Sequence, residues 1–201
     1  MQENLSREEI KFLADIDDEI RKTLKASRYR HSVSVANTAA CLAMRYDVPI
    51  YDTLLAGLLH DCAKNYSPPE LLSLCLKKNI PVGETERSNP SLLHGKYGAY
   101  IARNKFGVEN EDILSAIRYH TTGRPGMTRL EKIIFAADYM EPLRNQAPDL
   151  AAIRELIFTD IDSALLLILK GTLNHLKNSD LPIDEMTRKT FDYYKEKAIG
   201  Q

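Results

Sequence analysis

The chain lacks the features that would place it in a membrane, in a disulfide framework or on nucleic acid. Its 201 residues contain no window of eighteen apolar residues, so the sequence predicts no transmembrane span. The three cysteines form no C-x-x-C pair, which favours reduced thiols. A net charge of -1 and a pI near 6.5 lack the basic excess of a general nucleic-acid binder. We therefore expect no nucleic-acid partner and no membrane association.

The opening residues also lack the pattern of a signal peptide, because Met1-Gln2-Glu3-Asn4 are polar and acidic. Together with the unpaired cysteines, this predicts a cytoplasmic protein. A hydrophobic content of 44% is enough for one substantial core. A small phosphorylated ligand is compatible with the net charge, since a local cationic pocket does not require a basic protein.

Strand-type alternation is almost absent, and helical signals dominate. Three S/T-x-x-E boxes mark helix starts, at Ser6, Ser67 and Thr128. We find no internal repeat and no long or low-complexity linker; the longest irregular stretch is 79–90. The sequence therefore predicts a single all-α domain over residues 1–201. Its helices are expected near 7–25, 28–46, 52–64, 68–78, 91–105, 110–121, 128–140, 150–157, 160–177 and 184–197.

A histidine and an aspartate, His60 and Asp61, stand together at the end of an apolar stretch, 54–59. On a helix, adjacent side chains lie about 100° apart, so both can face one pocket between them. Lys64 shares their helical face, where it would place a cation beside a metal and an anionic oxygen. The alternative is a solvated lysine near a helix end.

Three further histidines occupy positions inside or at the end of helical patterns, namely His31, His94 and His120. Glycines at 95 and 98 follow His94 and permit the close approach of a neighbour or a ligand. After His120, the run Thr121-Thr122-Gly123-Arg124 offers hydroxyl, backbone and guanidinium donors that suit phosphate oxygens. An ordinary helix stop with turn residues is the alternative for that run.

Asp138 ends a second apolar run, 133–137, where an unpaired carboxylate is costly, so we expect a cationic partner. Arg144, six residues on, is either that partner or a ligand for a substrate phosphate. The fifth histidine, His175, stands apart in the sequence and is expected to be a surface or core residue rather than a metal ligand.

The candidate ligands are imidazoles and carboxylates, with no thiolate among them. This set suits iron, manganese, zinc or another first-row ion, and it disfavours a closed structural zinc site. A catalytic metal of this type keeps an open position for water and polarises a phosphoryl oxygen.

The order H…HD…H…H…D resembles the HD-domain metal-dependent phosphohydrolases, over roughly residues 28–145. The local contexts are similar to those of the symmetrical bis(5'-nucleosyl)-tetraphosphatases of HD type, the bacterial YqeK family. These contexts are Tyr29-Arg30-His31-Ser32, Gly57-Leu58-Leu59-His60-Asp61-Cys62-Ala63-Lys64, Leu93-His94-Gly95, Tyr119-His120-Thr121-Thr122-Gly123 and Ala136-Ala137-Asp138-Tyr139-Met140-Glu141-Pro142.

This resemblance implies a helical bundle, a homodimer, iron at the H-D site, and hydrolysis of diadenosine tetraphosphate to two molecules of ADP. By position, the metal ligands would be His31, His60, Asp61 and Asp138. His94 and His120 would face the phosphates or complete a second metal position. Lys64, Thr121 and Arg144 would contact the phosphates, and no motif after residue 145 indicates how the base is recognised.

A catalytic role is expected for four of these residues. Asp61 would orient the attacking water, and Lys64 would offset charge on the phosphate oxygens. His94 or His120 would donate a proton to the leaving oxygen. Substrate contacts, direct or through the metal, are expected for His31, Asp61, Lys64, His94, His120, Thr121, Asp138 and Arg144.

Other functions fit parts of the same pattern. A cyclic-dinucleotide phosphodiesterase is disfavoured, because its H-H-E…D-G-x-G-Y-P signature is missing after His120. A nucleotidase with the same metal pocket would accept shorter phosphates. A module that binds metal and nucleotide without turnover is a third reading. A helical domain whose histidines merely pack is least favoured, since interior polar groups need partners.

Overall fold

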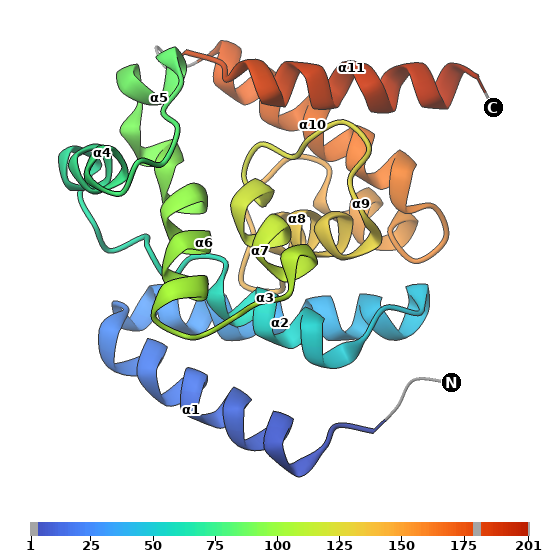
Figure 1. Cartoon of the computed structure of the whole chain (residues 1–201). Helices are drawn as coiled ribbons and strands as arrows, with labels where there is room; N and C mark the ends of the chain where they lie inside the picture. Colours follow the sequence, from blue (N-terminus) through green and yellow to red (C-terminus); the bar gives the residue numbers. More distant parts are fainter. Residues whose placement is uncertain (1–3, 179–181, 201) are drawn as a thin grey trace.

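The computed structural model describes residues 4–178 and 182–200 as a bundle of α-helices (Figure 1). Within these two stretches there is no strand, which confirms the all-α prediction, and no helix is long and apolar enough to cross a membrane. Residues 1–3, part of the segment judged unlike a signal peptide, lie outside the described residues. The helices are α1 (Arg7–Thr23), α2 (Ala26–Tyr46), α3 (Ile50–Leu59), α4 (Pro68–Lys77), α5 (Glu84–Ser88), the 3₁₀ helix η1 (Pro90–Leu93), α6 (His94–Asn104), α7 (Glu111–Tyr119), α8 (Arg129–Met140), α9 (Leu150–Leu156), α10 (Ile161–Lys177) and α11 (Glu185–Ile199).

The three predicted helix starts are confirmed by their hydrogen bonds. At α8, the Thr128 hydroxyl accepts from the Glu131 amide at 3.3 Å, and the Glu131 carboxylate accepts from the Thr128 amide at 2.6 Å. The same reciprocal pair opens α1 at Ser6, and at α4 the Glu70 carboxylate accepts from the Ser67 amide. Each box satisfies backbone donors that the first helical turn leaves free.

Two segments differ clearly from the prediction, while the other helix ends lie within about three residues of those expected. Helix α3 ends at Leu59 rather than at residue 64, because the backbone tightens into turns in which the Cys62 amide donates to Leu59 and the Lys64 amide donates to Asp61. The stretch 79–90, predicted to be irregular, contains α5. A helix of five residues is too short to show a 3.6-residue period, so sequence periodicity could not reveal it.

One hydrophobic core cluster extends from Ile16 in α1 to Tyr194 in α11. At its centre α2 and α3 pack against each other and against α8, while α7 contacts α3, α6 and α8 (Figure 1). A smaller cluster between α4, η1 and α6 includes Leu71, Leu93 and Tyr97. The five helices that carry or flank the candidate ligands therefore meet in the interior of the bundle.

Two glycines let these helices approach at backbone distance. A Cβ on Gly57 of α3 would lie 2.6 Å from the Ala36 Cα of α2, and a Cβ on Gly95 of α6 would lie 2.6 Å from the Arg118 carbonyl oxygen of α7. No side chain fits at such distances, so only glycine permits either crossing. The second contact agrees with the expectation that Gly95 admits a close neighbour.

Replacing Gly57 with alanine is expected to destabilise the protein. The added methyl must displace the backbone of α2, and overpacking of this kind costs about 1–3 kcal/mol. Urea unfolding measures the loss. The matched control is Gly98→Ala in α6, whose Cβ would make ordinary contacts at 3.4 Å or more. This variant should keep the full stabilisation of about 1 kcal/mol that alanine gives over glycine inside a helix. Equal stability of the two variants would contradict the assignment.

Candidate functional site

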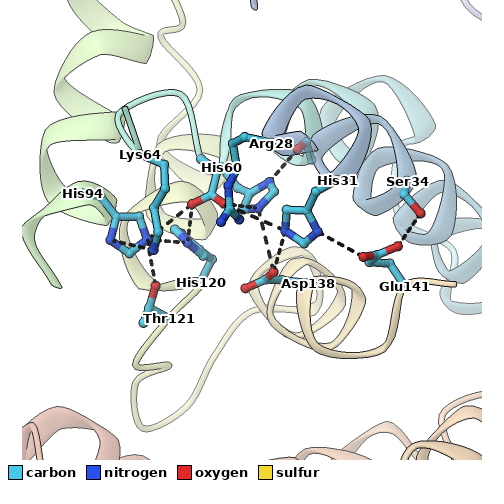
Figure 2. A network of polar contacts seen from close by, with 12 residues as sticks. Arg28, His31, Ser34, His60, Lys64, His94, His120, Thr121, Asp138 and Glu141 are labelled. Atoms are coloured by element: carbon cyan, nitrogen blue, oxygen red, sulfur yellow. Dashed lines mark hydrogen bonds and ion pairs between the residues drawn. The ribbon is translucent and has the colours of Figure 1, made fainter. Parts of the chain in front are cut away.

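Six side chains from five segments converge in the bundle interior, and we call them the polar cluster: His31, His60, Asp61, His94, His120 and Asp138 (Figure 2). They come from α2, from the turn after α3, from the first residue of α6, from the residue after α7, and from α8. All but Asp138 are buried, and Asp138 is half-buried. The fold thus brings together all the metal ligands expected from the sequence.

Asp61 lies at the centre of the polar cluster, with only 3% of its side chain exposed. Its Oδ2 is 3.4 Å from His60 Nε2 and 3.8 Å from His31 Nε2. Its Oδ1 faces the other way, 3.4 Å from His94 Nε2 and 3.6 Å from His120 Nε2. One carboxylate therefore joins two groups of imidazoles.

Two sets of these atoms have the spacing of ligands around one ion. One is His31, His60 and Asp138, the other is His60, Asp61 and His120, and in each set the ligand atoms lie within 4.8 Å of one another. Ligand atoms about 2.1 Å from a tetrahedral ion stand roughly 3–3.5 Å apart. In the first set, Asp138 Oδ1 is 2.9 Å from His31 Nε2 and 3.9 Å from His60 Nε2. These two distances lie on either side of the ideal separation between ligand atoms.

Each imidazole is oriented by a hydrogen bond at its other nitrogen. Nδ1 of His60, His94 and His120 lies 2.6–2.7 Å from the carbonyl oxygen three residues earlier in the chain, on Gly57, Ser91 and Ile117 respectively. A carbonyl oxygen only accepts, so each Nδ1 carries the proton. When the ring is neutral, each Nε2 then presents a lone pair to the centre of the cluster, which is the arrangement of metal-ligating histidines.

The atoms at the centre are short of donors. His31 Nε2, His60 Nε2 and Asp61 Oδ1 are buried and make no hydrogen bond, although His31 Nε2 is close to the Asp138 carboxylate. His94 Nε2 and His120 Nε2 face each other at 3.0 Å. Two lone pairs at that distance repel, and buried acceptors without donors are costly, so the set fits a cation.

The charge states follow from the same surroundings. Burial opposes ionisation of Asp61, but its carboxyl pKa still lies well below the ordinary value, because positive charge or a donated proton on the neighbouring His60 and His120 rings favours the carboxylate. Burial above all, together with the charge of Lys64, lowers the pKa of His94 to about 3. At neutral pH the centre therefore combines an ionised carboxylate with a neutral imidazole, both of which are metal ligands.

Two cationic side chains expected from the sequence reach the cluster. Lys64 is an exposed residue, but its Nζ lies 3.1 Å from His94 Nε2, and loss of solvation lowers the pKa of its ammonium group. Lys64 is therefore not simply a solvated lysine. Arg144 Nη2 donates to Asp138 Oδ1 at 3.0 Å, so in this structure it is the partner of Asp138.

The backbone that carries His60, Asp61 and Lys64 into the site differs from the prediction. They do not lie on one helical face, because α3 has ended and they occupy successive turns. The turns still direct all three side chains to the same centre. Thr121 also reaches it, with Oγ1 at 3.2 Å from His94 Nε2. His175, set aside as a ligand, is not part of the polar cluster and lines a neighbouring cavity between α10 and residues 143–148.

Sequence reasoning missed Glu141, which holds His31. Its Oε1 lies 3.1 Å from His31 Nδ1, while its Oε2 accepts from the Ser34 hydroxyl at 2.6 Å and the Leu143 amide at 2.7 Å (Figure 2). Burial opposes ionisation, but these hydrogen bonds lower the pKa of Glu141. The only sequence signal was a carboxylate three residues after Asp138, on the same face of the α8 end.

Arg28 was missed as well. Its Nη1 lies 2.6 Å from Asp61 Oδ2, and its side chain is 32% exposed. It stands three residues before His31 on α2, so both point toward Asp61. Arg28, Lys64 and Arg144 thus place three cations around the exposed side of the polar cluster.

Comparisons with known proteins agree with this geometry. The HD domain family matches residues 28–143, close to the 28–145 expected from the motifs. A symmetrical bis(5'-nucleosyl)-tetraphosphatase of Bacillus subtilis is 38% identical over 87% of this chain and 92% of its own, and one of Staphylococcus aureus is 36% identical over 87% and 90%. A crystal structure from Clostridium acetobutylicum, described as a predicted HD superfamily hydrolase involved in NAD metabolism, has a TM-score of 0.88 at 34% identity, covering 92% of this chain and 97% of its own.

Replacing Glu141 with glutamine is expected to weaken metal binding by about tenfold or more, because the charge that orients His31 and raises its basicity is lost. Competition with a chelator measures the affinity. Glu131→Gln is the matched control, since Glu131 is also buried on α8 but bonds Thr128, Ser115 and Arg124 instead. A similar loss in both variants would show a general effect on folding and refute the role of Glu141.

Proposed function

Because the chain belongs to the HD-domain family, and within it to the symmetrical bis(5'-nucleosyl)-tetraphosphatases, we propose that the polar cluster is the active site of a metal-dependent diadenosine tetraphosphate hydrolase. The products are two molecules of ADP. The observation that carries the assignment is the ring of inward-facing Nε2 atoms around Asp61, in a chain with such relatives.

The metal position with the most complete ligand set uses His31, His60, Asp61 and Asp138, and we propose iron there, with manganese or zinc as substitutes. A second position is formed by His94, His120 and Asp61 Oδ1. Such ions supply an activated water and polarise phosphoryl oxygens.

The surrounding cations provide for the substrate's phosphates. Lys64 lies beside His94, and Arg144 lies beside Asp138, on the two sides of the cluster. Thr121 adds a hydroxyl beside His94, on the same side of the cluster as Lys64. Arg28 adds a further guanidinium beside Asp61. These groups offset the charge of a polyphosphate and strengthen as charge builds on its oxygens.

The proton-donor role expected for His94 or His120 does not suit their hydrogen bonds. In both, the Nδ1 proton is committed to a backbone carbonyl, and Nε2 presents a lone pair. We therefore propose that both act as ligands or acceptors, and that Asp61 orients the water. The leaving group is a phosphate oxygen of ADP, which is weakly basic and needs no strong acid.

The activity is tested by chromatography of the products. Metal-loaded protein is incubated with diadenosine tetraphosphate, and in parallel with ATP, ADP and cyclic dinucleotides. ADP as the sole product is expected. ATP plus AMP would rule out symmetrical cleavage, and no turnover with iron or manganese would favour a binding module. Metal analysis of the purified protein tests the choice of iron.

Replacing Asp61 with alanine is expected to abolish both metal content and hydrolysis, because this carboxylate joins the two imidazole groups. Elemental analysis and the product assay measure the two effects. Asp52→Ala on α3 is the control, since that partly buried carboxylate bonds Asn110 away from the cluster. An Asp61→Ala protein that is active without metal would contradict the site.

Replacing Lys64 with methionine is expected to lower kcat/KM by about 10²-fold while metal content is unchanged, because one charge that stabilises the transition state is lost. Steady-state kinetics and metal analysis separate the two effects. Lys77→Met, at an exposed position on α4, should behave like the wild type. Unchanged kinetics in Lys64→Met would assign this lysine to the solvated surface.

We further propose a homodimeric cytoplasmic protein that forms one domain over residues 1–201 and has a dinucleoside polyphosphate or ADP as its small-molecule partner, with no nucleic-acid or membrane partner. A single core cluster from α1 to α11 supports one domain. Light scattering at micromolar concentration is expected to give twice the chain mass of 22.8 kDa, and a mass of one chain would refute the dimer.

A further inference from the structure

Two adjoining cavities lie on the Arg144 side of the polar cluster. The smaller, of about 200 Å³, is lined by His120, Thr121 and Asp138 and so opens directly onto the cluster. The larger, of about 600 Å³, lies between residues 143–148 and α10. Both cavities share four lining residues, Tyr139, Arg144, Ala147 and Thr172. The phosphate side of the site therefore continues into a larger space.

The larger cavity combines apolar walls with a polar margin. Leu143, Pro148 and Leu176 supply apolar surface, while Asn145, Gln146 and His175 supply amide and imidazole groups. Its volume falls in the range of about 300–1,000 Å³ that small-molecule sites have. A purine nucleoside matches this lining, because it is a flat ring with an apolar face and a hydrogen-bonding edge.

Gly171 keeps the floor of the larger cavity open. A Cβ at this position would lie 3.0 Å from the Tyr139 hydroxyl and 3.7 Å from the Pro148 ring. That hydroxyl donates to the Pro148 carbonyl at 3.2 Å, which ties α8 to the loop that forms the opposite wall. A side chain on Gly171 would therefore occupy space between two fixed walls.

Arg144 stands at the junction of the two cavities. Its guanidinium is bonded to Asp138 through Nη2 at 3.0 Å and through Nε to the Asp138 carbonyl at 3.2 Å. A ligand that spans the junction would place its phosphates beside Arg144 and the polar cluster, and its nucleoside in the larger cavity.

We propose that the larger cavity is the binding site for the purine nucleoside of the substrate half that stays bound as a nucleoside diphosphate. This rests on the proposed function and extends it to residues after 145, where the sequence gives no motif. A cavity of about 440 Å³ between residues 79–81, α6 and α7 is the competing location. None of the polar cluster lines it, so a nucleotide there would be separated from the site.

Calorimetry on the metal-loaded protein tests the proposal with ADP and inorganic pyrophosphate as probes. Wild type is expected to bind ADP more tightly than pyrophosphate, since only ADP has a nucleoside. Gly171→Leu, which fills the larger cavity, is expected to weaken ADP binding by about tenfold or more and to leave pyrophosphate unchanged. Asn104→Leu, at an exposed residue lining the competing cavity, is the control.

If Gly171→Leu does not fold, His175→Ala replaces it, because His175 is exposed and lines the edge of the same cavity. It should weaken ADP binding selectively. Equal affinities of wild type for the two probes, equal losses for both probes, or a selective ADP loss in Asn104→Leu would each overturn the proposal. The readout is binding, so a failure of diadenosine tetraphosphate turnover is detected separately in the product assay.

Discussion

The constraint on which the structure depends is the burial of the Asp61 carboxylate in the middle of an all-helical core. A charged carboxylate without partners costs several kcal/mol in such a place, so its surroundings must supply positive charge. Arg28 reaches Oδ2, and four imidazoles surround the two oxygens. Three of the four imidazoles give their Nδ1 protons to backbone carbonyls, so in the neutral form they have no proton left to donate to the carboxylate. A bound metal cation would resolve this conflict, which is why the polar cluster suits a metal better than a packed core does.

The helix crossings set the distances within that centre. Gly57 lets α3 touch the backbone of α2, three residues before His60, and Gly95 lets α6 touch α7 beside His94 and His120. With any other residue at either position, the two backbones would have to move apart, and the imidazoles they carry with them. The carbonyl of Gly57 also accepts from His60 Nδ1, so one residue both brings the helices together and orients a ligand. Packing and chemistry therefore share the same positions.

Much of this was accessible from the sequence because its signals are local. Capping boxes mark the helix starts. A histidine beside an aspartate after an apolar run can be recognised within eight residues of sequence. Glu141 and Arg28 were not predicted, because their partners His31 and Asp61 lie 110 and 33 residues away in the sequence. Likewise, the early end of α3 depends on turns that residues 60–64 form against the bundle, which periodicity does not report.

The position of the nucleoside cavity bears on which bond is cleaved. If one nucleoside occupies the larger cavity and Arg144 holds the adjoining phosphates, the polar cluster meets the polyphosphate at a fixed distance from that nucleoside. Symmetrical cleavage then requires that two phosphates lie between the nucleoside in the cavity and the bridge that is broken. The bond that is cleaved would thus depend on the distance between the nucleoside cavity and the polar cluster. The Tyr139–Pro148 wall and Arg144 set this distance, rather than the metal ligands. With the nucleoside placed there, a nucleotidase with the same metal ligands would differ from a symmetrical tetraphosphatase in this spacing.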